Sequence, residues 1–80
     1  MKVRFYGKLA DLLGNERDVQ VDAPCTVEAL RTHLARQCPE AAGPLAEKRV
    51  RACIDDAFVH DGHILSGGEQ VELLAPVSGG

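Results

Sequence analysis

The residues with the clearest capacity for chemistry are the last two, Gly79 and Gly80. They have no side chains, so the C-terminal carboxyl group is their reactive group. Such a group has a pKa of roughly 3.3 to 3.7, so at neutral pH it is a carboxylate, a poor acyl electrophile until it is activated. Fixing a glycine costs more backbone entropy than fixing any other residue, so we expect residues 76–80 to be flexible when free. A terminal Gly-Gly is also common in frayed ends and expression remnants, and the residues alone leave both interpretations open.

Histidines form a second group of candidate functional residues. The segment His60-Asp61-Gly62-His63 combines two imidazoles and a carboxylate, types that bind metals or move protons. Its spacing suits a tight turn better than a converging site, and no further ligand flanks it. We therefore expect no metal site, and we expect His33 to be a partly exposed helix residue.

The cysteines Cys25, Cys38 and Cys53 are odd in number and fit neither a disulfide framework nor a zinc or redox motif. We expect reduced thiols in a cytoplasmic protein, with Cys38 and Cys53 packed as small apolar residues. Cys25 precedes an expected helix, whose dipole could lower the pKa of its thiol. The sequence shows no signal-peptide pattern and no apolar run near the ~20 residues that cross a membrane.

The elements that must position these residues belong to a small chain. Its 80 residues are 45% apolar and 26% charged, which indicates one globular domain. At this size only about 60% of the unfolded surface is buried, so we expect one small core, no deep catalytic cavity and a need for a partner. A net charge of -3 argues against nucleic-acid binding.

The charges are unevenly distributed along the chain. Residues 1–51 hold nine basic and seven acidic side chains, whereas residues 52–80 hold five acids and no Lys or Arg. This acidic last part favours a basic partner surface or, alternatively, consists of solvated acids around turns.

In the first half of the chain, hydrophobic periodicity predicts strands and helices in turn. Alternation predicts a strand over residues 2–6 that Gly7 ends, and Leu9, Leu12 and Leu13 predict a short helix. A second strand is expected over residues 17–21, after a link at residues 15–16. Thr26 is a good N-cap for the main helix, which should end near residue 38 because Pro39 disfavours helical geometry there.

The second half predicts further strands separated by turns. Residues 39–48 are expected to form a surface loop around Gly43-Pro44, followed by a strand over residues 50–54 and a turn at Asp55-Asp56. A short strand should follow at residues 58–59, and Ile64 and Leu65 are expected to plug one end of the core. After a turn at residues 66–68, alternation predicts a last strand over residues 71–75.

Two strands, a helical crossover and further strands within about 75 residues are best satisfied by one sheet with one main helix on one face. The sequence therefore predicts an α+β protein with the ubiquitin-like β-grasp arrangement and a mixed sheet of four to five strands. We expect this domain to span residues 1–75 and a flexible Gly-Gly tail to span residues 76–80.

At the level of whole motifs, the sequence resembles the MoaD family, the sulfur carriers that form the small subunit of molybdopterin synthase. The resemblance extends over the whole chain and is carried by residues 7–14, the helix start at residues 26–30 and the turn at residues 66–71. Its most specific part is the ending Pro76-Val77-Ser78-Gly79-Gly80. The fold that the resemblance implies is the one predicted above.

The resemblance also implies a chemistry for Gly80. An ATP-using, MoeB-like enzyme related to ubiquitin-activating enzymes would adenylate its carboxylate, and a sulfur donor would convert the adenylate to a thiocarboxylate. The tail would then enter a MoaE-like large subunit and give its sulfur to a pterin precursor, in an assembly of two small and two large subunits. The chain would have no active site and no permanently bound cofactor of its own.

The roles of the other tail residues follow from this scheme. Gly79 would be the slim residue leading Gly80 through a narrow channel, with Ser78 and Val77 as weaker contacts. We expect Leu74 and Pro76 to belong to the surface that partners recognise, flanked by the acidic groups. The alternatives are a carrier for thiamine or another pathway, a carrier that also modifies proteins, and a ubiquitin-like interaction module without chemistry at its terminus.

Overall fold

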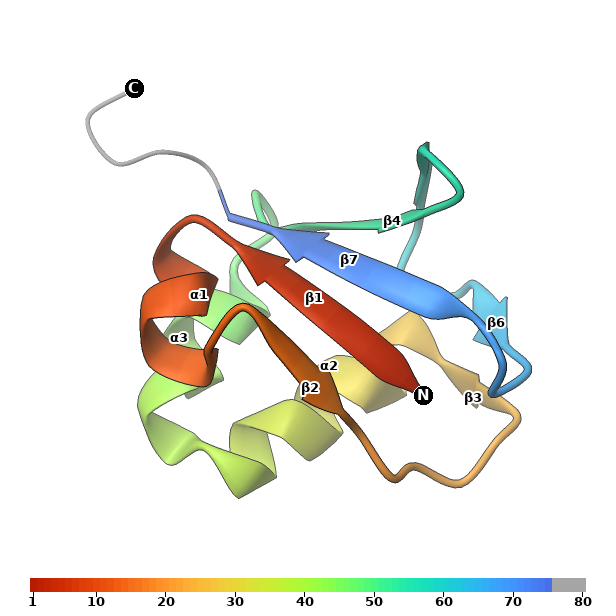
Figure 1. The fold of residues 1–80 in the computed structure, drawn as a ribbon, viewed down its shortest axis with the longest axis horizontal. Helices are drawn as coiled ribbons and strands as arrows, with labels where there is room; N and C mark the ends of the chain where they lie inside the picture. Colours follow the sequence, from red (N-terminus) through yellow and green to blue (C-terminus); the bar gives the residue numbers. More distant parts are fainter. Residues whose placement is uncertain (76–80) are drawn as a thin grey trace.

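The centre of the fold is a pair of parallel strands from distant parts of the chain. In the computed structural model, which describes residues 1–75, β1 (Lys2–Tyr6) lies beside β7 (Gln70–Leu74), with Val3 opposite Val71 and Phe5 opposite Leu73. Figure 1 shows the two strands running in the same direction through the middle of the sheet. The predicted tail, residues 76–80, lies outside the described residues, so the proposed domain boundary remains a prediction.

Antiparallel strands flank this pair on both sides. The sheet has five strands in the order β2-β1-β7-β4-β5, with β2 at Glu16–Asp18, β4 at Arg51–Ile54 and β5 at Ala57–Val59. A separate pair joins β3 (Cys25–Thr26) to β6 (Ile64–Leu65). The α+β, ubiquitin-like arrangement with a mixed sheet is therefore confirmed.

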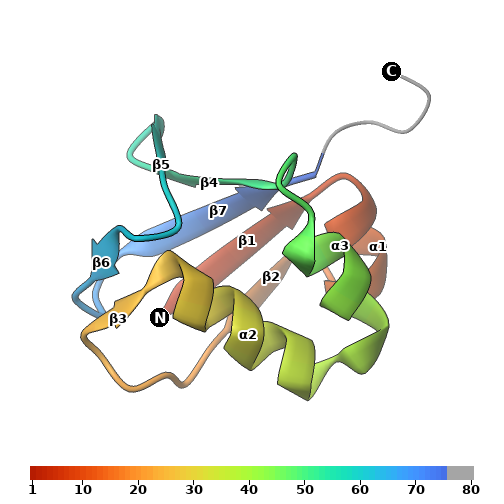
Figure 2. The same cartoon turned by 180° about the vertical axis from the view of Figure 1, so that it is seen from behind.

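All helices of the described chain pack on one face of the sheet (Figure 2). They are α1 (Lys8–Leu13), α2 (Val27–Gln37), the 3-10 helix η1 (Pro39–Ala41) and α3 (Ala42–Ala46). Alternation decides which side chains they cover: Val3 and Phe5 are buried, whereas Lys2, Arg4 and Tyr6 point to the other face. The core under the helices is mainly aliphatic and is built from Val3, Phe5, Leu9, Leu13, Val19, Val27, Leu30, Leu34, Ala41, Leu45, Val50, Ala52, Leu65, Val71 and Leu73.

The start of α2 is fixed by hydrogen bonds that satisfy its first backbone N–H groups. As predicted, Thr26 is the N-cap, and its hydroxyl oxygen accepts from the N–H of Ala29 at 3.1 Å. The N–H groups of Val27 and Glu28 donate to the carbonyls of His63 and Asp61. The His60-Asp61-Gly62-His63 turn therefore closes the N-terminal end of α2, and this is a structural role.

The expectation of a surface loop over residues 39–48 is wrong. η1 and α3 occupy Pro39–Ala46, and Ala41 and Leu45 are almost fully buried. Proline does not prevent this, because a first helical turn tolerates a residue without a backbone N–H. The segment folds because its two buried residues, Ala41 and Leu45, complete the core next to α1 and α2.

Three smaller expectations also need correction. β2 covers Glu16–Asp18, so Glu16 belongs to the strand and the buried Val19 follows it. Leu65 is buried as predicted, but Ile64 is 60% exposed and does not plug the core. Ala75 lies just beyond the end of β7. Within residues 1–75, none of the helices has the length and hydropathy needed to span a membrane.

Candidate functional site

The point from which the tail continues is held by the first turn of the chain. Ala75, the last described residue, donates its N–H to the carbonyl of Tyr6 at 3.3 Å. Gly7 has a φ of 68°, and a Cβ at this position would stand 2.6 Å from the carbonyl oxygen of Ala75. Because no side chain fits there, Gly7 allows the end of β7 to pack against the β1–α1 turn. From its position after the first strand, Gly7 is expected only to end that strand, so this contact is not predicted from the sequence.

Leu74 lies on the face of the sheet opposite the helices. Strand register puts it beside Tyr6 of β1, and puts Glu72 between Arg4 of β1 and Cys53 of β4. We call these five residues, Arg4, Tyr6, Cys53, Glu72 and Leu74, the outer-face cluster. The sequence placed Leu74 on this face by alternation, whereas its neighbours depend on strand pairing. Pro76, Val77, Ser78, Gly79 and Gly80, the other predicted site residues, lie outside the described residues.

A polar network crosses the outer-face cluster. The Tyr6 hydroxyl donates to Oε2 of Glu72 at 2.7 Å, and the Arg4 guanidinium lies 6.0 Å from the centre of the Tyr6 ring. The hydrogen bond to the Glu72 carboxylate raises the pKa of Tyr6 above its ordinary value of 10.0. The cluster therefore combines the Tyr6 ring, the apolar Leu74 side chain and two charged groups, Arg4 and Glu72, that both interact with Tyr6.

The acids of the last part of the chain do not surround Leu74. Asp55 and Asp56 form the β4–β5 turn, and Asp61 pairs with Arg31 at 3.1 Å. The Glu69 carboxylate accepts from the N–H groups of Ser66 and Gly67, and these bonds lower its pKa to about 2. Of these five acids, only Glu72 lies in the outer-face cluster, so most of them serve turns and local contacts.

The cysteines and histidines do not assemble into a metal site within residues 1–75. Cys38 packs half-buried against the core, and Cys53 is buried on the outer face. The turn at residues 60–63 is confirmed, with the N–H of Gly62 donating to Nδ1 of His60 at 3.0 Å. Packing of Cys38 and Cys53 and the turn at residues 60–63 therefore agree with the sequence-based expectations.

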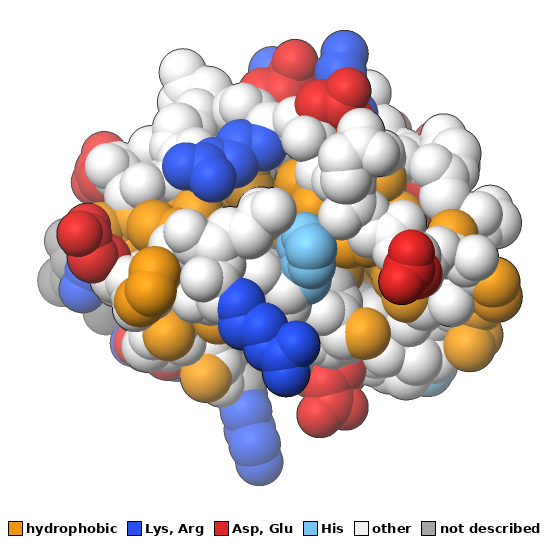
Figure 3. Space-filling view, turned by 90° about the horizontal axis from the view of Figure 1, so that it is seen from below, with side chains coloured by type: hydrophobic (Ala, Val, Ile, Leu, Met, Phe, Trp, Pro, Cys, Tyr) orange, Lys and Arg blue, Asp and Glu red, His pale blue; other side chains and the backbone are white. Residues whose placement is uncertain are grey.

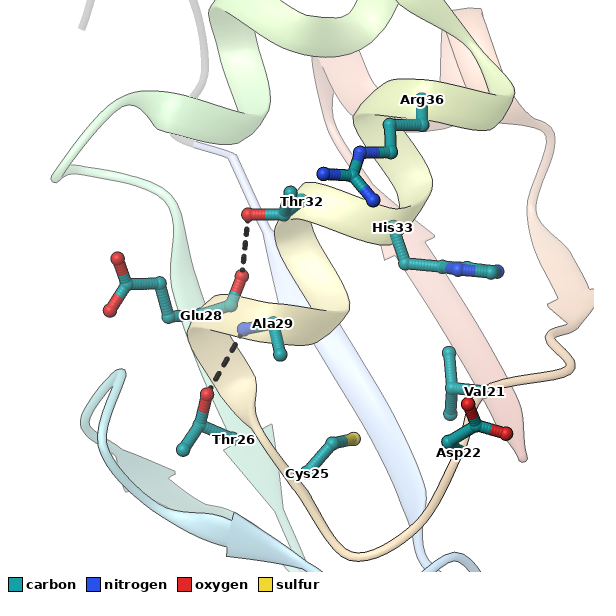
Figure 4. Close-up of a pocket in the computed structure, with 9 residues that line it drawn as sticks. All are labelled: Val21, Asp22, Cys25, Thr26, Glu28, Ala29, Thr32, His33 and Arg36. Carbon is teal, nitrogen blue, oxygen red and sulfur yellow. Dashed lines mark hydrogen bonds between the residues drawn. The ribbon is translucent and has the colours of Figure 1, made fainter.

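Cys25 and His33 line a groove along α2, on the side of the molecule away from the outer-face cluster. It encloses about 450 Å³ and is formed by Val21, Asp22, Cys25, Thr26, Glu28, Ala29, Thr32, His33 and Arg36. Figure 4 shows the stretch from Val21 to Cys25 passing beside the helix, and Figure 3 shows acidic, basic and apolar side chains intermixed on this underside. Its lining mixes acidic, basic, polar and apolar side chains, so it does not indicate one class of ligand.

Comparisons with known proteins agree with the β-grasp geometry. A family model described as ThiS family matches residues 3–80. The chain is 36% identical over 81 residues to the molybdopterin synthase sulfur carrier subunit of Escherichia coli (strain K12), covering 100% of this chain and 99% of the relative.

Two solved structures are similar in fold. Small archaeal modifier protein 1 of Haloferax volcanii superposes with a TM-score of 0.80 at 19% identity, covering 95% of each chain. A Pyrococcus furiosus protein described as molybdopterin converting factor subunit 1 gives a TM-score of 0.78 at 17% identity, again over 95% of each chain. At these identities the structures support the fold, whereas the family assignment rests on the two sequence matches. The chain belongs to the ThiS family and is a β-grasp sulfur carrier of the ThiS/MoaD type.

Proposed function

We propose that this protein is the small subunit of a molybdopterin synthase and carries sulfur as a thiocarboxylate on Gly80. The observation that carries this proposal is the 36% identity to a molybdopterin synthase sulfur carrier subunit, which covers the whole chain and 99% of the relative. A small subunit of this type implies a partner in the synthase. The chain itself is a cosubstrate in this scheme and needs no catalytic cavity.

The proposed chemistry has three steps. The Gly80 carboxylate attacks the α-phosphorus of ATP, and pyrophosphate leaves to give an acyl adenylate. A sulfur donor at the oxidation level of sulfide then attacks the carbonyl carbon, and AMP leaves with one of the original carboxylate oxygens. The thiocarboxylate sulfur then attacks an electrophilic carbon of the pterin precursor and displaces an oxygen group from it. Water hydrolyses the resulting acyl–sulfur bond, which leaves the sulfur on the pterin and restores the Gly80 carboxylate. Activation is necessary because a free carboxylate is a poor acyl electrophile at neutral pH.

The described contacts support a division of roles between the folded body of the chain and residues 76–80. The hydrogen bond from Ala75 to Tyr6 and the close packing at Gly7 fix the point from which residue 76 continues. The outer-face cluster lies beside that point, which makes it the natural surface for the large subunit and for the adenylating enzyme. Pro76 would contribute to this surface, and Val77, Ser78 and Gly79 would lead Gly80 into each partner.

Mass spectrometry of the intact chain tests the carrier chemistry. After incubation with the cognate adenylating enzyme, ATP and a sulfur source, the mass should increase by the replacement of one oxygen by sulfur. A chain lacking Gly80 is the matched control: it should unfold at the same urea concentration as the full chain and gain no sulfur. Normal thiocarboxylate formation by the truncated chain, or none by the full chain, would contradict the proposal.

Copurification distinguishes this function from a carrier for thiamine or another pathway. The large subunit of a molybdopterin synthase should be recovered with the tagged chain and should release pterin product when the thiocarboxylate form is supplied. Recovery of a thiazole-forming enzyme instead would indicate that the chain carries sulfur for the thiamine pathway. Tryptic peptides bearing a Gly-Gly remnant on lysine would indicate an additional role as a protein modifier.

A further inference from the structure

A second hollow lies at the corner where β4 begins and β5 ends, next to α2. Its volume is about 480 Å³. Its walls come from one residue of α2, from the segment that leads into β4 and from the segment that leaves β5. The lining residues are Arg31, Lys48, Val50, Arg51, Phe58, Val59, His60 and Asp61. We call this hollow the β5 corner. Neither the core nor the sulfur chemistry proposed above assigns it a role.

The β5 corner has a positive character, although the whole chain has a net charge of -3. Arg31 and Asp61 compensate each other, because Nε and Oδ1 are 3.1 Å apart and the Arg31 guanidinium also donates to the carbonyls of Leu45 and Val50. Lys48 and Arg51 are exposed, and within residues 1–75 neither forms an ion pair. Two uncompensated cations therefore face the hollow.

An aromatic side chain stands beside these cations. Phe58 is 59% exposed, and the Arg51 guanidinium lies 4.4 Å from the centre of its ring. A large exposed aromatic group stacked with arginine is typical of surfaces that become buried when a partner binds. Val59, which is partly exposed, supplies further apolar wall. The β5 corner therefore suits a ligand with carboxylates next to an apolar side chain.

The backbone of β5 offers hydrogen bonds to the same ligand. β5 is the last strand of its sheet, and Phe58 pairs with Cys53 one step from the two-residue turn between Ile54 and Ala57. In such a hairpin the two residues that flank the turn, Ile54 and Ala57, bond to each other through their N–H and C=O groups. The N–H and C=O groups of the next residue, Phe58, therefore point away from β4, toward the open edge of the sheet. An extended segment can add to this edge as a further strand.

We propose that the β5 corner binds an extended acidic segment of a partner protein, with its carboxylates facing Lys48 and Arg51 and an apolar side chain against Phe58. A second copy of the chain fits less well, because it brings the same cations to the corner and offers a strand of only three residues. Arg51 pairs with Leu74 of the outer-face cluster, so a partner docked there could extend such a segment into the corner and gain avidity.

The test uses the full-length chain, labelled with nitrogen-15, and blocked hexapeptides as probes. One peptide alternates valine with aspartate, and the matched peptide alternates valine with lysine. Titrations followed by amide resonances give both the dissociation constant and the location of binding. Lys48→Glu reverses one cation of the corner, and Lys8→Glu reverses an exposed lysine on α1 as the control.

The acidic peptide should shift the amide resonances of residues 48–51 and 57–60 and bind at least about fivefold tighter than the lysine peptide, as expected for an exposed charge pair worth up to ~1 kcal/mol. Lys48→Glu should weaken its binding by a similar factor, and Lys8→Glu should leave it unchanged. Equal binding of both peptides, insensitivity to Lys48→Glu, or shifts centred elsewhere would overturn the proposal.

Two further outcomes would also overturn it. Self-association that shifts Phe58 would assign the corner to a second copy, and tighter binding of a single-stranded oligonucleotide would assign it to nucleic acid. A chain lacking Gly80 should bind the acidic peptide normally. The result is therefore independent of whether Gly80 carries sulfur.

Discussion

The two faces of the central sheet come from the same strands but follow different rules. On β1, Val3 and Phe5 are 0% and 2% exposed under the helices, whereas Tyr6 on the other face is 38% exposed. On β7, Leu73 is fully buried, whereas its neighbour Leu74 is only partly covered. In Figures 1 and 2 the helices lie on one side of these strands. The inner face is filled by buried apolar side chains, whereas the outer face keeps part of its side chains accessible to the partner proposed above.

The placement of aromatic residues sharpens this difference. The chain has one Tyr, two Phe and no Trp. Phe5 is in the core, but Tyr6 and Phe58 are both on the outer face, where burial within the chain cannot account for them. Exposed aromatic side chains on one face are consistent with the docking surface proposed there.

The largest expected effect separates neighbouring leucines on the two faces. Leu73→Ala should lower the free energy of unfolding by about 2 to 5 kcal/mol, because it removes a fully buried side chain and leaves a cavity. Leu74→Ala should cost less than about 1 kcal/mol, because its side chain is only partly covered. Urea unfolding of both variants measures the contrast, and similar losses would show that the outer face also supports the fold.

A second prediction concerns the place where the chain passes from the sheet to the helical layer. Gly7→Ala should destabilise the protein by more than Gly14→Ala. Both glycines have positive φ, and a strained backbone of this kind costs about 1 to 3 kcal/mol. An added Cβ at Gly14 meets nothing within 4 Å, whereas at Gly7 it meets the Ala75 carbonyl oxygen at 2.6 Å.

The matched pair therefore isolates the contact with Ala75. Urea unfolding gives the stability difference, and the amide resonance of Ala75 should move only in Gly7→Ala. If the two variants lost equal stability and left Ala75 unmoved, Gly7 would have no special role in holding the end of β7.

Periodicity predicted the elements that are regular and largely self-contained. α2 could be placed because Thr26 caps its start and Pro39 restricts its end, and β1 because its alternation is strong. η1 and α3 could not be predicted, since Gly43-Pro44 favours a loop locally. Their stability comes from Ala41 and Leu45 packing against residues distant in sequence, and a local pattern does not contain that information.

The candidate site divides in the same way. Alternation placed Leu74 on the outer face, but the neighbours Tyr6 and Glu72 are 66 residues apart in the sequence and meet only through the register of β1 and β7. The contact between Gly7 and Ala75 likewise depends on where two strands end. The only sequence signal for this contact is a glycine directly after the first strand, and many turns have a glycine at that position.

A third prediction tests recognition by the outer face. Leu74→Glu should weaken binding to the synthase large subunit about tenfold or more, equivalent to roughly 1.4 kcal/mol, because it places a charge where an apolar contact is expected. Gln70→Glu introduces the same charge on the same face at the other end of β7 and should have little effect. Titration calorimetry gives both affinities, and an unchanged affinity for Leu74→Glu would remove Leu74 from the docking surface.

The smallest expected effect concerns the exposed hydrogen bond between Tyr6 and Glu72 on the outer face. The neutral phenol donates to the carboxylate, and this raises the pKa of Tyr6. A raised folded-state pKa means that the bond stabilises the fold fully below the ordinary value of 10.0 and that this contribution is lost as pH rises through the folded-state pKa. Glu72→Gln should therefore return the pKa of Tyr6 toward 10.0 with little change in unfolding at neutral pH. Because the chain has a single tyrosine, ultraviolet absorbance titration reads this pKa directly. A large loss of stability at neutral pH would instead make the outer face part of the structural framework and weaken the distinction between the two faces.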